Sequence, residues 1–280
     1  MKKQKVIVLG VGVIGLSVAN YLAQFKQYDV HGFDVSSNAV QDARLQGIKS
    51  TSIWEELPVA DVYIICVSTG LKGKHPDMSQ IFDAGENIKR HLGGNNNPLI
   101  SVESTVVPGT CRRLYEGLNK AANLVHVPHR YWLVDSVNYG VKQKRILGAI
   151  DQISQIKGVD FYSSMDVPVD VVTRIEIAEM TKIVENAYRF VEIAFAEELS
   201  MLCKEYKIDF EELRKTCNTL IRKSDKEDWR VQILEARNGI GGHCLPKDIR
   251  YLLSLVHDSK LIKGAIAADK SYKRNLSNYS

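Results

Sequence analysis

The sequence has 280 residues, which is enough for two domains or one large one. With 45% hydrophobic and 25% charged residues it has the composition of an ordinary globular protein, and its net charge of +4 shows no basic stripe, so nucleic-acid binding is a poor hypothesis. No run is long and apolar enough to span a membrane, and the five cysteines lack disulfide or metal-site spacing, which favours reduced thiols in the cytoplasm and predicts no metal site.

The N-terminal residues MKKQK and the apolar run after them imitate the basic and apolar regions of a signal peptide. Three glycines interrupt this run, and no small-residue cleavage site follows it. We therefore expect these residues to belong to the folded protein.

Up to about residue 165, short apolar runs alternate with amphipathic helical stretches. Strands are predicted at KVIVLG, DVHGFD, DVYIICVS, PLISVES, LVHVP and RILGAI, and helices at stretches such as VANYLAQF and IFDAGENIKRHL. Strands that alternate with helices indicate a parallel sheet covered on both faces. We predict an α/β fold of the Rossmann type, a doubly wound parallel sheet, over residues 1–172.

The motif GVGVIG follows the first predicted strand and opens a helix. Gly10 permits a tight turn, Gly12 lets the backbone approach a pyrophosphate, and Gly15 lets helix and strand pack closely. Asp34 ends the second strand, where a carboxylate accepts hydrogen bonds from a ribose diol, and no basic residue occupies positions 35–40, which favours NAD over NADP. A glycine turn that binds no nucleotide is the weaker alternative. The predicted cofactor-binding residues are Gly10, Gly12, Val13, Ile14, Gly15, Asp34, Ser68, Thr69, Ser104 and Thr105.

From about Thr173 to Lys207 the sequence has no glycine or proline and is apolar on nearly every face. A helix of this kind must be buried on several sides, so we expect it at the interface of a homodimer. Asp209 is predicted to cap a further helix that begins at Phe210. Residues 173–280 are therefore predicted to form an all-α domain for dimerisation and substrate binding.

Three further segments carry candidate chemistry. VSTG and ESTVVPGT end two later strands, where the ligand crevice of an open α/β sheet lies. Lys182 and Asn186 are four residues apart and share one face of the long helix; such a pair is usually a solvated stripe, but a substrate oxyanion would also supply their partner. In GIGGHCLPKD, glycines precede Cys244 and charges follow it, which is typical either of a reactive thiol or of a glycine-rich turn with an incidental cysteine.

Together the motifs resemble those of the UDP-glucose/GDP-mannose dehydrogenase family. GVGVIG with Asp34, VSTG followed by HPDMS, STVVPGT, AEMTKIVENAYR and GIGGHCLPKD occur in the family's order over nearly the whole chain. The resemblance implies that the C6 hydroxyl of a nucleotide sugar, a UDP-hexose or UDP-N-acetylhexosamine, is oxidised twice to the uronic acid while two NAD are reduced.

The resemblance also implies roles for individual residues. Cys244 would trap the aldehyde as a thiohemiacetal and carry the later thioester. Lys182 and Asn186 would stabilise the oxyanion, Asp248 would act as or assist the general base, and Thr105 would position the water. The implied substrate-binding residues are His129, Arg130, Lys182, Asn186, Arg230 and Gly241.

The sequence departs from the family pattern in two places. Family members continue into a third domain, whereas this sequence stops at about the linker AADKSYKRNLSNYS, so we expect a short form whose third domain is absent or supplied by a separate chain. In VPHRYW, His129 stands where the family has a glutamate; it could be a base near neutral pH or a packing residue beside Arg130. His243 and Arg230 resemble residues of the family's UDP-N-acetylhexosamine branch, whereas LPKD resembles the glucose and GDP-mannose branches. The identity of the sugar therefore stays open.

Two other functions remain open. A β-hydroxyacid dehydrogenase shares the domain order and the Lys/Asn pair but needs no cysteine. An NAD-binding subunit without turnover would fit the missing domain and the missing glutamate. Retention of Cys244, Lys182, Asn186 and Asp248 together favours an enzyme.

Overall fold

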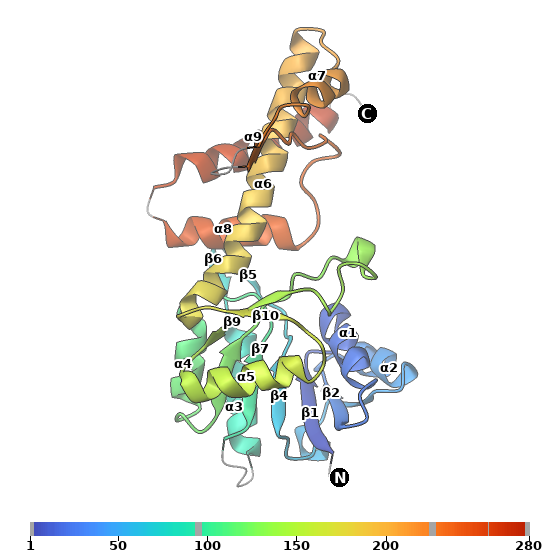
Figure 1. Cartoon of the computed structure of the whole chain (residues 1–280), viewed down its shortest axis with the longest axis vertical. Coiled ribbons are helices and arrows are strands. Elements are labelled where there is room, and N and C mark those ends of the chain that lie inside the picture. Colours follow the sequence, from blue (N-terminus) through green and yellow to red (C-terminus); the bar gives the residue numbers. More distant parts are fainter. Residues whose placement is uncertain (1–2, 93–96, 224–227, 257, 278–280) are drawn as a thin grey trace. The chain divides into compact units, whose positions relative to one another are not determined.

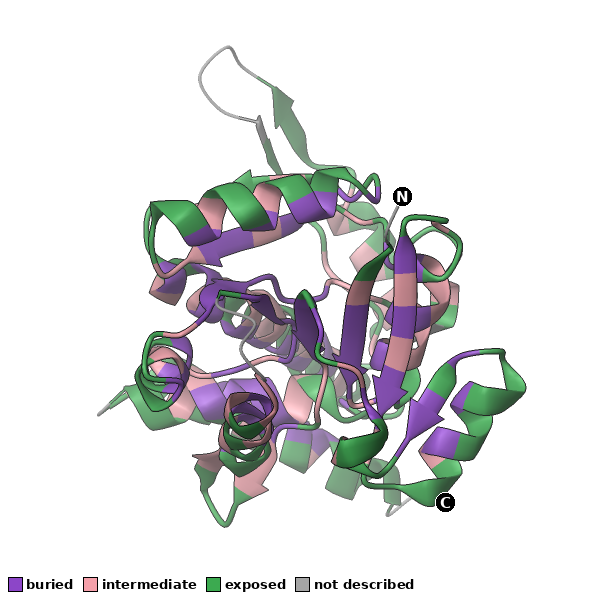
Figure 2. Ribbon diagram, turned by 90° about the horizontal axis from the view of Figure 1, so that it is seen from below, coloured by how far each residue is buried: buried purple, intermediate pink, exposed green. Residues whose placement is uncertain are grey.

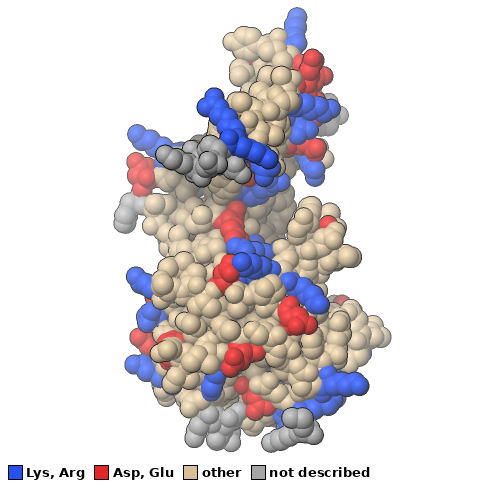
Figure 3. Space-filling view, viewed as in Figure 1, with Lys and Arg blue, Asp and Glu red and all other residues tan. Residues whose placement is uncertain are grey.

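The computed structural model of the chain describes residues 3–92, 97–223, 228–256 and 258–277. The chain forms two compact units, Met1–Lys72 with Pro76–Lys182, and Gly73–His75 with Ile183–Ser280, so that the boundary falls inside one long helix (Figure 1). The domain division predicted at residue 172 precedes this helix and stays a prediction. Basic and acidic side chains are interspersed on the face shown in Figure 3.

The first unit is built on an eight-stranded sheet with the order β10-β9-β8-β7-β4-β1-β2-β3. Its strands are β1 (Gln4–Leu9), β2 (Tyr28–Phe33), β3 (Lys49–Thr51), β4 (Val62–Ile65), β7 (Leu99–Val102), β8 (Asn123–His126), β9 (Arg145–Ala149) and β10 (Val169–Val171). Neighbouring strands are parallel from β3 to β8, and β9 pairs antiparallel to β8. All six predicted strands are present, which confirms the Rossmann-type fold. The three-residue strands β3 and β10 were not predicted because they are too short to show a periodic pattern.

Helices cover both faces of this sheet (Figure 2). They are α1 (Val13–Leu22), α2 (Ser37–Leu45), α3 (Ser79–His91), α4 (Thr110–Gly117) and α5 (Gln152–Ser163), with 3-10 turns η1 (Trp54–Glu56) and η2 (Leu133–Asp135) and a separate two-stranded sheet of β5 (Gly70–Lys72) and β6 (His75–Asp77). Val6 and Val8 of β1 pack with Leu22 of α1 and Phe161 of α5 in one apolar cluster. Ile7, which alternates with them, is equally buried on the opposite face. Burial on both faces explains why the strands read as continuous apolar runs.

The second unit is helical apart from one antiparallel pair of strands. It contains α6 (Ile175–Glu205), which begins in the first unit, α7 (Phe210–Cys217), β11 (Ile221–Lys223), β12 (Asp228–Arg230), α8 (Cys244–Leu255) and α9 (Lys260–Ser277). The predicted long helix is confirmed, and Asp209 caps α7 as predicted, because its Oδ1 accepts the backbone N–H of Glu212 at 2.8 Å. The exposed β11 and β12 correct the expectation of a wholly α unit. Among the described helices, none combines the length and apolar character that a membrane crossing requires.

A buried carboxylate joins the start of α6 to the N-terminus of α4. Glu179 is 0% exposed, and its two oxygens accept the backbone N–H groups of Gly109 and Cys111, each at 2.7 Å. Burial raises the pKa of Glu179, while the backbone donors act in the opposite direction. The first turn of α4 therefore takes its hydrogen-bond acceptor from a distant helix.

We predict that Glu179→Ala lowers the free energy of unfolding by about 2–4 kcal/mol, because it leaves two buried amides without acceptors. Urea denaturation near neutral pH measures this loss. Glu176→Ala is the matched control one turn earlier on α6. Glu176 pairs with Arg112, whose side chain is 50% exposed, so its removal should cost less than about 1 kcal/mol. Equal losses in the two variants would contradict the assigned role of Glu179.

Candidate functional site

The glycine-rich turn between β1 and α1 has the shape that a dinucleotide requires. Gly10 has a φ of 85°, and a Cβ there would lie 2.7 Å from the carbonyl oxygen of Cys66. A Cβ on Gly15 would lie 1.8 Å from the carbonyl oxygen of Gly10. At Gly12 a Cβ would meet nothing within 4 Å. Gly10 and Gly15 thus allow close packing, whereas Gly12 leaves open space at the start of α1.

The surroundings of this turn fit a pyrophosphate and a ribose. In the part of the chain that the structure describes, no side chain caps the first turn of α1, whose N-cap is Gly12. Uncapped amides at a helix N-terminus favour a phosphate. Asp34 follows β2 directly, and its Oδ1 accepts the backbone N–H of Ser36 at 2.9 Å, which orients the carboxylate at the strand end. The residues present therefore fit a dinucleotide cofactor.

The loops after β4 and β7 are joined by side-chain hydrogen bonds. Ser104 Oγ donates to the carbonyl of Val67 at 2.6 Å, and Thr69 Oγ1 donates to the carbonyl of Thr105 at 2.8 Å. Ser68, which lies between Val67 and Thr69 in the sequence, is exposed. Because β4 and β7 are neighbours, the structure brings these predicted cofactor residues together at the carboxyl ends of the strands. Their contact with the cofactor stays a prediction.

A buried ionic cluster lies at the end of β7. Glu103 Oε2 forms an ion pair with Arg145 Nη1 at 3.1 Å, and both side chains are 1% exposed. His129 Nε2 contacts the same oxygen, and the Tyr162 hydroxyl donates to the other. Burial alone would raise the pKa of Glu103, but the charge of Arg145 and the hydrogen bonds that Glu103 accepts from His129 and Tyr162 outweigh it and lower this pKa to about 2. Glu103 is therefore a carboxylate throughout the physiological range.

This cluster determines what His129 does. His129 is 8% exposed, and burial followed by the charge of Arg145 lowers its pKa, while Glu103 opposes this. We describe its contact with Glu103 as a hydrogen bond from a neutral imidazole, because Arg145 already supplies the cation. The placement favours the packing alternative over a water-activating base. Arg130 donates through Nη1 to the carbonyl of Lys144 at 3.1 Å, and a contact of either residue with substrate stays a prediction.

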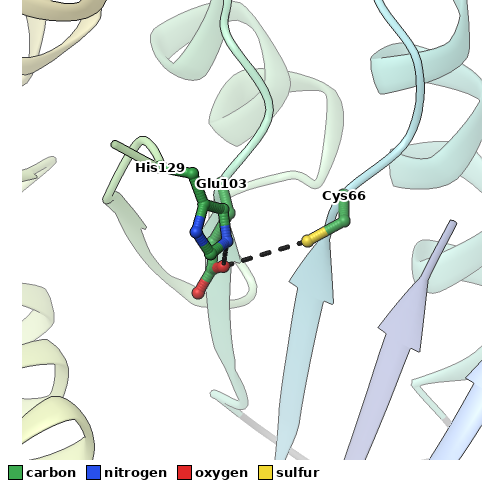
Figure 4. Close-up of side chains that lie close together, drawn as sticks. All are labelled: Cys66, Glu103 and His129. Atoms are coloured by element: carbon green, nitrogen blue, oxygen red, sulfur yellow. Dashed lines mark hydrogen bonds and ion pairs between the residues drawn. The ribbon is translucent and has the colours of Figure 1, made fainter. Parts of the chain in front are cut away.

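Cys66, Glu103 and His129 also lie within 4.8 Å of one another and could by distance hold a metal ion (Figure 4). Two observations oppose this interpretation. The guanidinium of Arg145 lies 3.4 Å from His129 Nε2 and already neutralises Glu103, so that a second cation would be repelled. Burial, and then the charge of Glu103, raises the pKa of the Cys66 thiol, which disfavours the thiolate that binds a metal. We interpret the group as a hydrogen-bonded network.

In the second unit, Cys244 is exposed and is the first residue of α8. Asp248 lies one turn further along the helix and is 1% exposed. Asn186 Nδ2 donates to Asp248 Oδ2 at 2.5 Å, and Lys247 pairs with Oδ1. The structure thus joins two predicted residues, Asn186 and Asp248, one helical turn from the predicted nucleophile.

Sequence reasoning missed the role of Lys247. This side chain is 7% exposed, and its ammonium lies 4.1 Å from the centre of the Tyr251 ring, in addition to its pairing with Asp248. A buried lysine requires such partners. Its position between the proline and the aspartate of LPKD was the available signal, but burial of a lysine cannot be read from one short motif.

The remaining predicted residues are one half-buried lysine and two exposed residues. Lys182 is half-buried on α6, and its charge helps to lower the pKa of His129 in the first unit. Arg230 is exposed on β12. Gly241 is exposed, and a Cβ there would meet nothing within 4 Å. A substrate contact of Arg230 or Gly241 stays a prediction.

Comparisons with known proteins give a consistent result. The NAD binding domain of the UDP-glucose/GDP-mannose dehydrogenase family matches residues 40–165, and the central domain of the same family matches residues 176–270. A UDP-N-acetyl-D-mannosamine dehydrogenase of Methanococcus vannielii is 30% identical over 94% of this chain, which spans only 64% of that relative's length.

Two solved structures are also informative. A UDP-D-ManNAc dehydrogenase from Pyrococcus horikoshii superposes with a TM-score of 0.85 at 28% identity, covering 98% of this chain and 70% of that one. A 3-hydroxyisobutyrate dehydrogenase of Mycobacterium tuberculosis superposes with a TM-score of 0.71 over 98% of this chain and 94% of that one, but at 13% identity it shows a shared fold alone.

We predict that Asp34→Ala weakens NAD binding about tenfold to a hundredfold and narrows the preference for NAD over NADP. The variant loses charged hydrogen bonds to the ribose, worth about 1.5–3 kcal/mol, and loses the repulsion of a 2′-phosphate. Fluorescence titration with both nucleotides measures the change. Asp29→Ala is the matched control on β2, because Asp29 pairs with Lys49 at 2.8 Å and should leave both affinities unchanged. Equal affinities of the native chain for NAD and NADP would contradict the role of Asp34.

Proposed function

Because the chain belongs to the UDP-glucose/GDP-mannose dehydrogenase family, we propose that it oxidises the C6 hydroxyl of a nucleotide sugar to the carboxylate with NAD. The observation that carries the proposal is the exposed Cys244 at the start of α8, one turn before an aspartate held by Lys247 and Asn186. A β-hydroxyacid dehydrogenase needs no such thiol, so this arrangement favours the proposed reaction over that alternative.

The proposed reaction proceeds through the thiol of Cys244. Bound NAD supplies the hydride acceptor for both oxidations. In the first, the C6 hydroxyl gives up its proton and the carbon gives up a hydride, which leaves an aldehyde. The sulfur of Cys244 adds to this aldehyde as a thiohemiacetal, and loss of the second hydride and of the hydroxyl proton gives a thioester. Water then cleaves the carbon–sulfur bond, which releases the carboxylic acid and restores the thiol.

Asp248 is proposed to act as, or to assist, the base in these steps. Lys247 and Asn186 both contact its carboxylate, which restricts the directions in which it can accept a proton. Asn186 is therefore proposed to orient Asp248 in addition to stabilising the oxyanion with Lys182. Negative charge that develops on the sulfur of Cys244 is favoured at the N-terminus of α8.

Thioester hydrolysis requires a positioned water and a proton acceptor. His129 is a poor acceptor for this step, because it is buried and its Nε2 is engaged with Glu103. Thr105 is half-buried and is proposed to hold the water. Asp248 is then the proposed proton acceptor, and His129 takes a structural role.

The relatives support a particular class of substrate. The Methanococcus vannielii relative and the Pyrococcus horikoshii structure are both named as dehydrogenases of UDP-N-acetyl-D-mannosamine. We propose a UDP-N-acetylhexosamine of this kind as the substrate, in preference to UDP-glucose.

We predict that the chain forms two NADH per sugar with UDP-N-acetylmannosamine in a panel of UDP- and GDP-sugars. Cys244→Ser should lower acid formation by about three orders of magnitude or more, because no thioester can form. NADH absorbance and mass spectrometry of the sugar product measure both results. Cys217→Ser, at a half-buried position on α7, is the control and should keep the native rate. Native-rate acid formation by Cys244→Ser, or oxidation of hydroxyacids in place of sugars, would contradict the proposal.

We further propose that the chain is a homodimer through α6. Four exposed apolar side chains lie on one face of this helix at spacings of four and seven residues: Val184, Tyr188, Phe195 and Leu202, which are 43%, 65%, 56% and 49% exposed. A second copy of the same helix is the simplest partner for such a face, because it presents the same apolar stripe.

Light scattering at micromolar concentration should therefore give twice the chain mass of 31.5 kDa. Phe195→Glu should give the monomer, because it places a charge in the proposed interface. Ile153→Glu, which alters an equally exposed apolar residue on α5, should leave the mass unchanged. A native chain that scatters as a monomer would refute the dimer.

A further inference from the structure

A charged cluster in the second unit contacts the segment that leads to Cys244. Asp269 of α9 accepts the backbone N–H of Ile240 through Oδ1 at 2.8 Å. Lys273, one turn later, donates to the carbonyl oxygen of Ile240 at 2.7 Å and to Asp269 Oδ2 at 2.9 Å. Both polar groups of the Ile240 backbone are therefore bound by α9, four residues before Cys244.

Two neighbouring contacts extend this attachment. Gly239 has a φ of 84°, and a Cβ there would lie 2.4 Å from Cε of Lys273, so the lysine stem packs against the glycine backbone. The Tyr272 hydroxyl donates to the carbonyl of Arg237 at 2.7 Å. Ile240 itself is 3% exposed within the apolar core of the unit. The segment is thus held at residues 237–240, whereas the next residues up to Cys244 are exposed.

Glu197 of α6 interacts electrostatically with Asp269 and Lys273 of this cluster and is 0% exposed. Neither of its carboxyl oxygens has a hydrogen-bond partner among the described residues. Burial, followed by the charge of Asp269, raises the pKa of Glu197 to about 7, while Lys273 opposes the shift. The pKa of Tyr272 is raised by burial and, to a smaller extent, by the charge of Glu197. Asp269 and Lys273 of α9 are the charged groups that act on the pKa of Glu197, and Tyr272 is a further titratable group on the same helix. On α8, Lys247 and Asp248 pair with each other.

The net charge of the group formed by Glu197, Asp269 and Lys273 depends on whether Glu197 is protonated. With Glu197 neutral, the ammonium of Lys273 balances Asp269 and still binds the Ile240 carbonyl. With Glu197 ionised, the buried carboxylates of Glu197 and Asp269 compete for the single ammonium of Lys273, whose side chain is 42% exposed. The ammonium is then drawn away from the Ile240 carbonyl, and the repulsion between Glu197 and Asp269 weakens the hold on the Ile240 N–H.

We propose that Glu197, Asp269 and Lys273 form a loop anchor that positions the segment before Cys244, and that the anchor holds this segment while Glu197 carries a proton. The proposal rests on the proposed function only in the role given to Cys244. Its test measures the backbone of the chain and uses no substrate, so its outcome is separate from that of the NADH assay.

The sign of the pH dependence follows from the raised pKa. Between the ordinary glutamate pKa of 4.5 and about 7, the folded chain keeps the proton that the unfolded chain has lost. Rising pH in this window therefore destabilises the folded state, and the effect is complete once the pH exceeds the folded pKa.

Hydrogen exchange at the Ile240 amide is the direct test. We expect its protection, after correction for the intrinsic exchange rate, to fall about tenfold between pH 6 and pH 8, which is the change in the protonated fraction of a group with a pKa of about 7. Glu197→Gln, which keeps the shape and stays neutral, should hold the protection at pH 8 at the native pH 6 level. The Glu212 amide, bound to Asp209 at the start of α7, is the internal control and should not change with pH.

Asp269→Asn is a second variant, which tests the loop anchor even if Glu197→Gln does not fold. It removes the negative charge that pairs with Lys273 and acts on Glu197, so protection of Ile240 should fall at both pH values and lose its pH dependence. Equal native protection at pH 6 and pH 8, or the same pH dependence in Glu197→Gln as in the native chain, would overturn the loop anchor. The proposed function would be unaffected by either result.

Discussion

The ion pair between Glu103 and Arg145 is the interaction on which the candidate cofactor edge depends. Removing one partner of such a buried pair costs about 3–5 kcal/mol, because the other charge then lacks compensation. Glu103 directly follows β7, and the backbone N–H groups of Glu103 and Ser104 both donate to the carbonyl of Ile65 at the end of β4. The loop that carries Thr105 therefore starts from a point where a buried charge, a neutral histidine and the backbone of the next strand meet.

Three buried glutamates show how the nearby cations and hydrogen-bond donors determine the charge state of a carboxyl group. Glu103 has a guanidinium and further hydrogen bonds, and its pKa is lowered to about 2. Glu179 has two backbone amides but no cation at comparable burial, and its pKa is raised. Glu197 lacks any hydrogen-bond donor in the described chain, and its pKa rises to about 7. The same side chain thus serves as a permanent anion, a helix cap and a group that titrates near neutrality.

The sequence was sufficient wherever structure follows from local pattern. GVGVIG predicted the open turn because each glycine has a steric reason within the turn itself, and Asp209 predicted the start of α7 because a cap acts over three residues. The contacts of His129 could not be predicted in this way, since Glu103 and Arg145 come from other strands. Glu197 was equally hidden, because in the sequence it is one polar residue in a long helix, and only the packing of α9 shows that it is buried. Lys247 stood within a recognised motif, but its burial was not visible there.

The cysteines differ in exposure, and this difference determines which thiol an oxidant reaches first. Burial raises the pKa of the Cys66 and Cys111 thiols, and Cys203 is buried in the second unit. Cys244 is the exposed member of the five. Peroxides attack accessible sulfur first, so the thiol proposed to carry the sugar is also the one at which a sulfenic acid would form and could be returned by cellular thiols. If Cys244 acts as proposed, the same exposure would make turnover sensitive to the redox state of the surroundings.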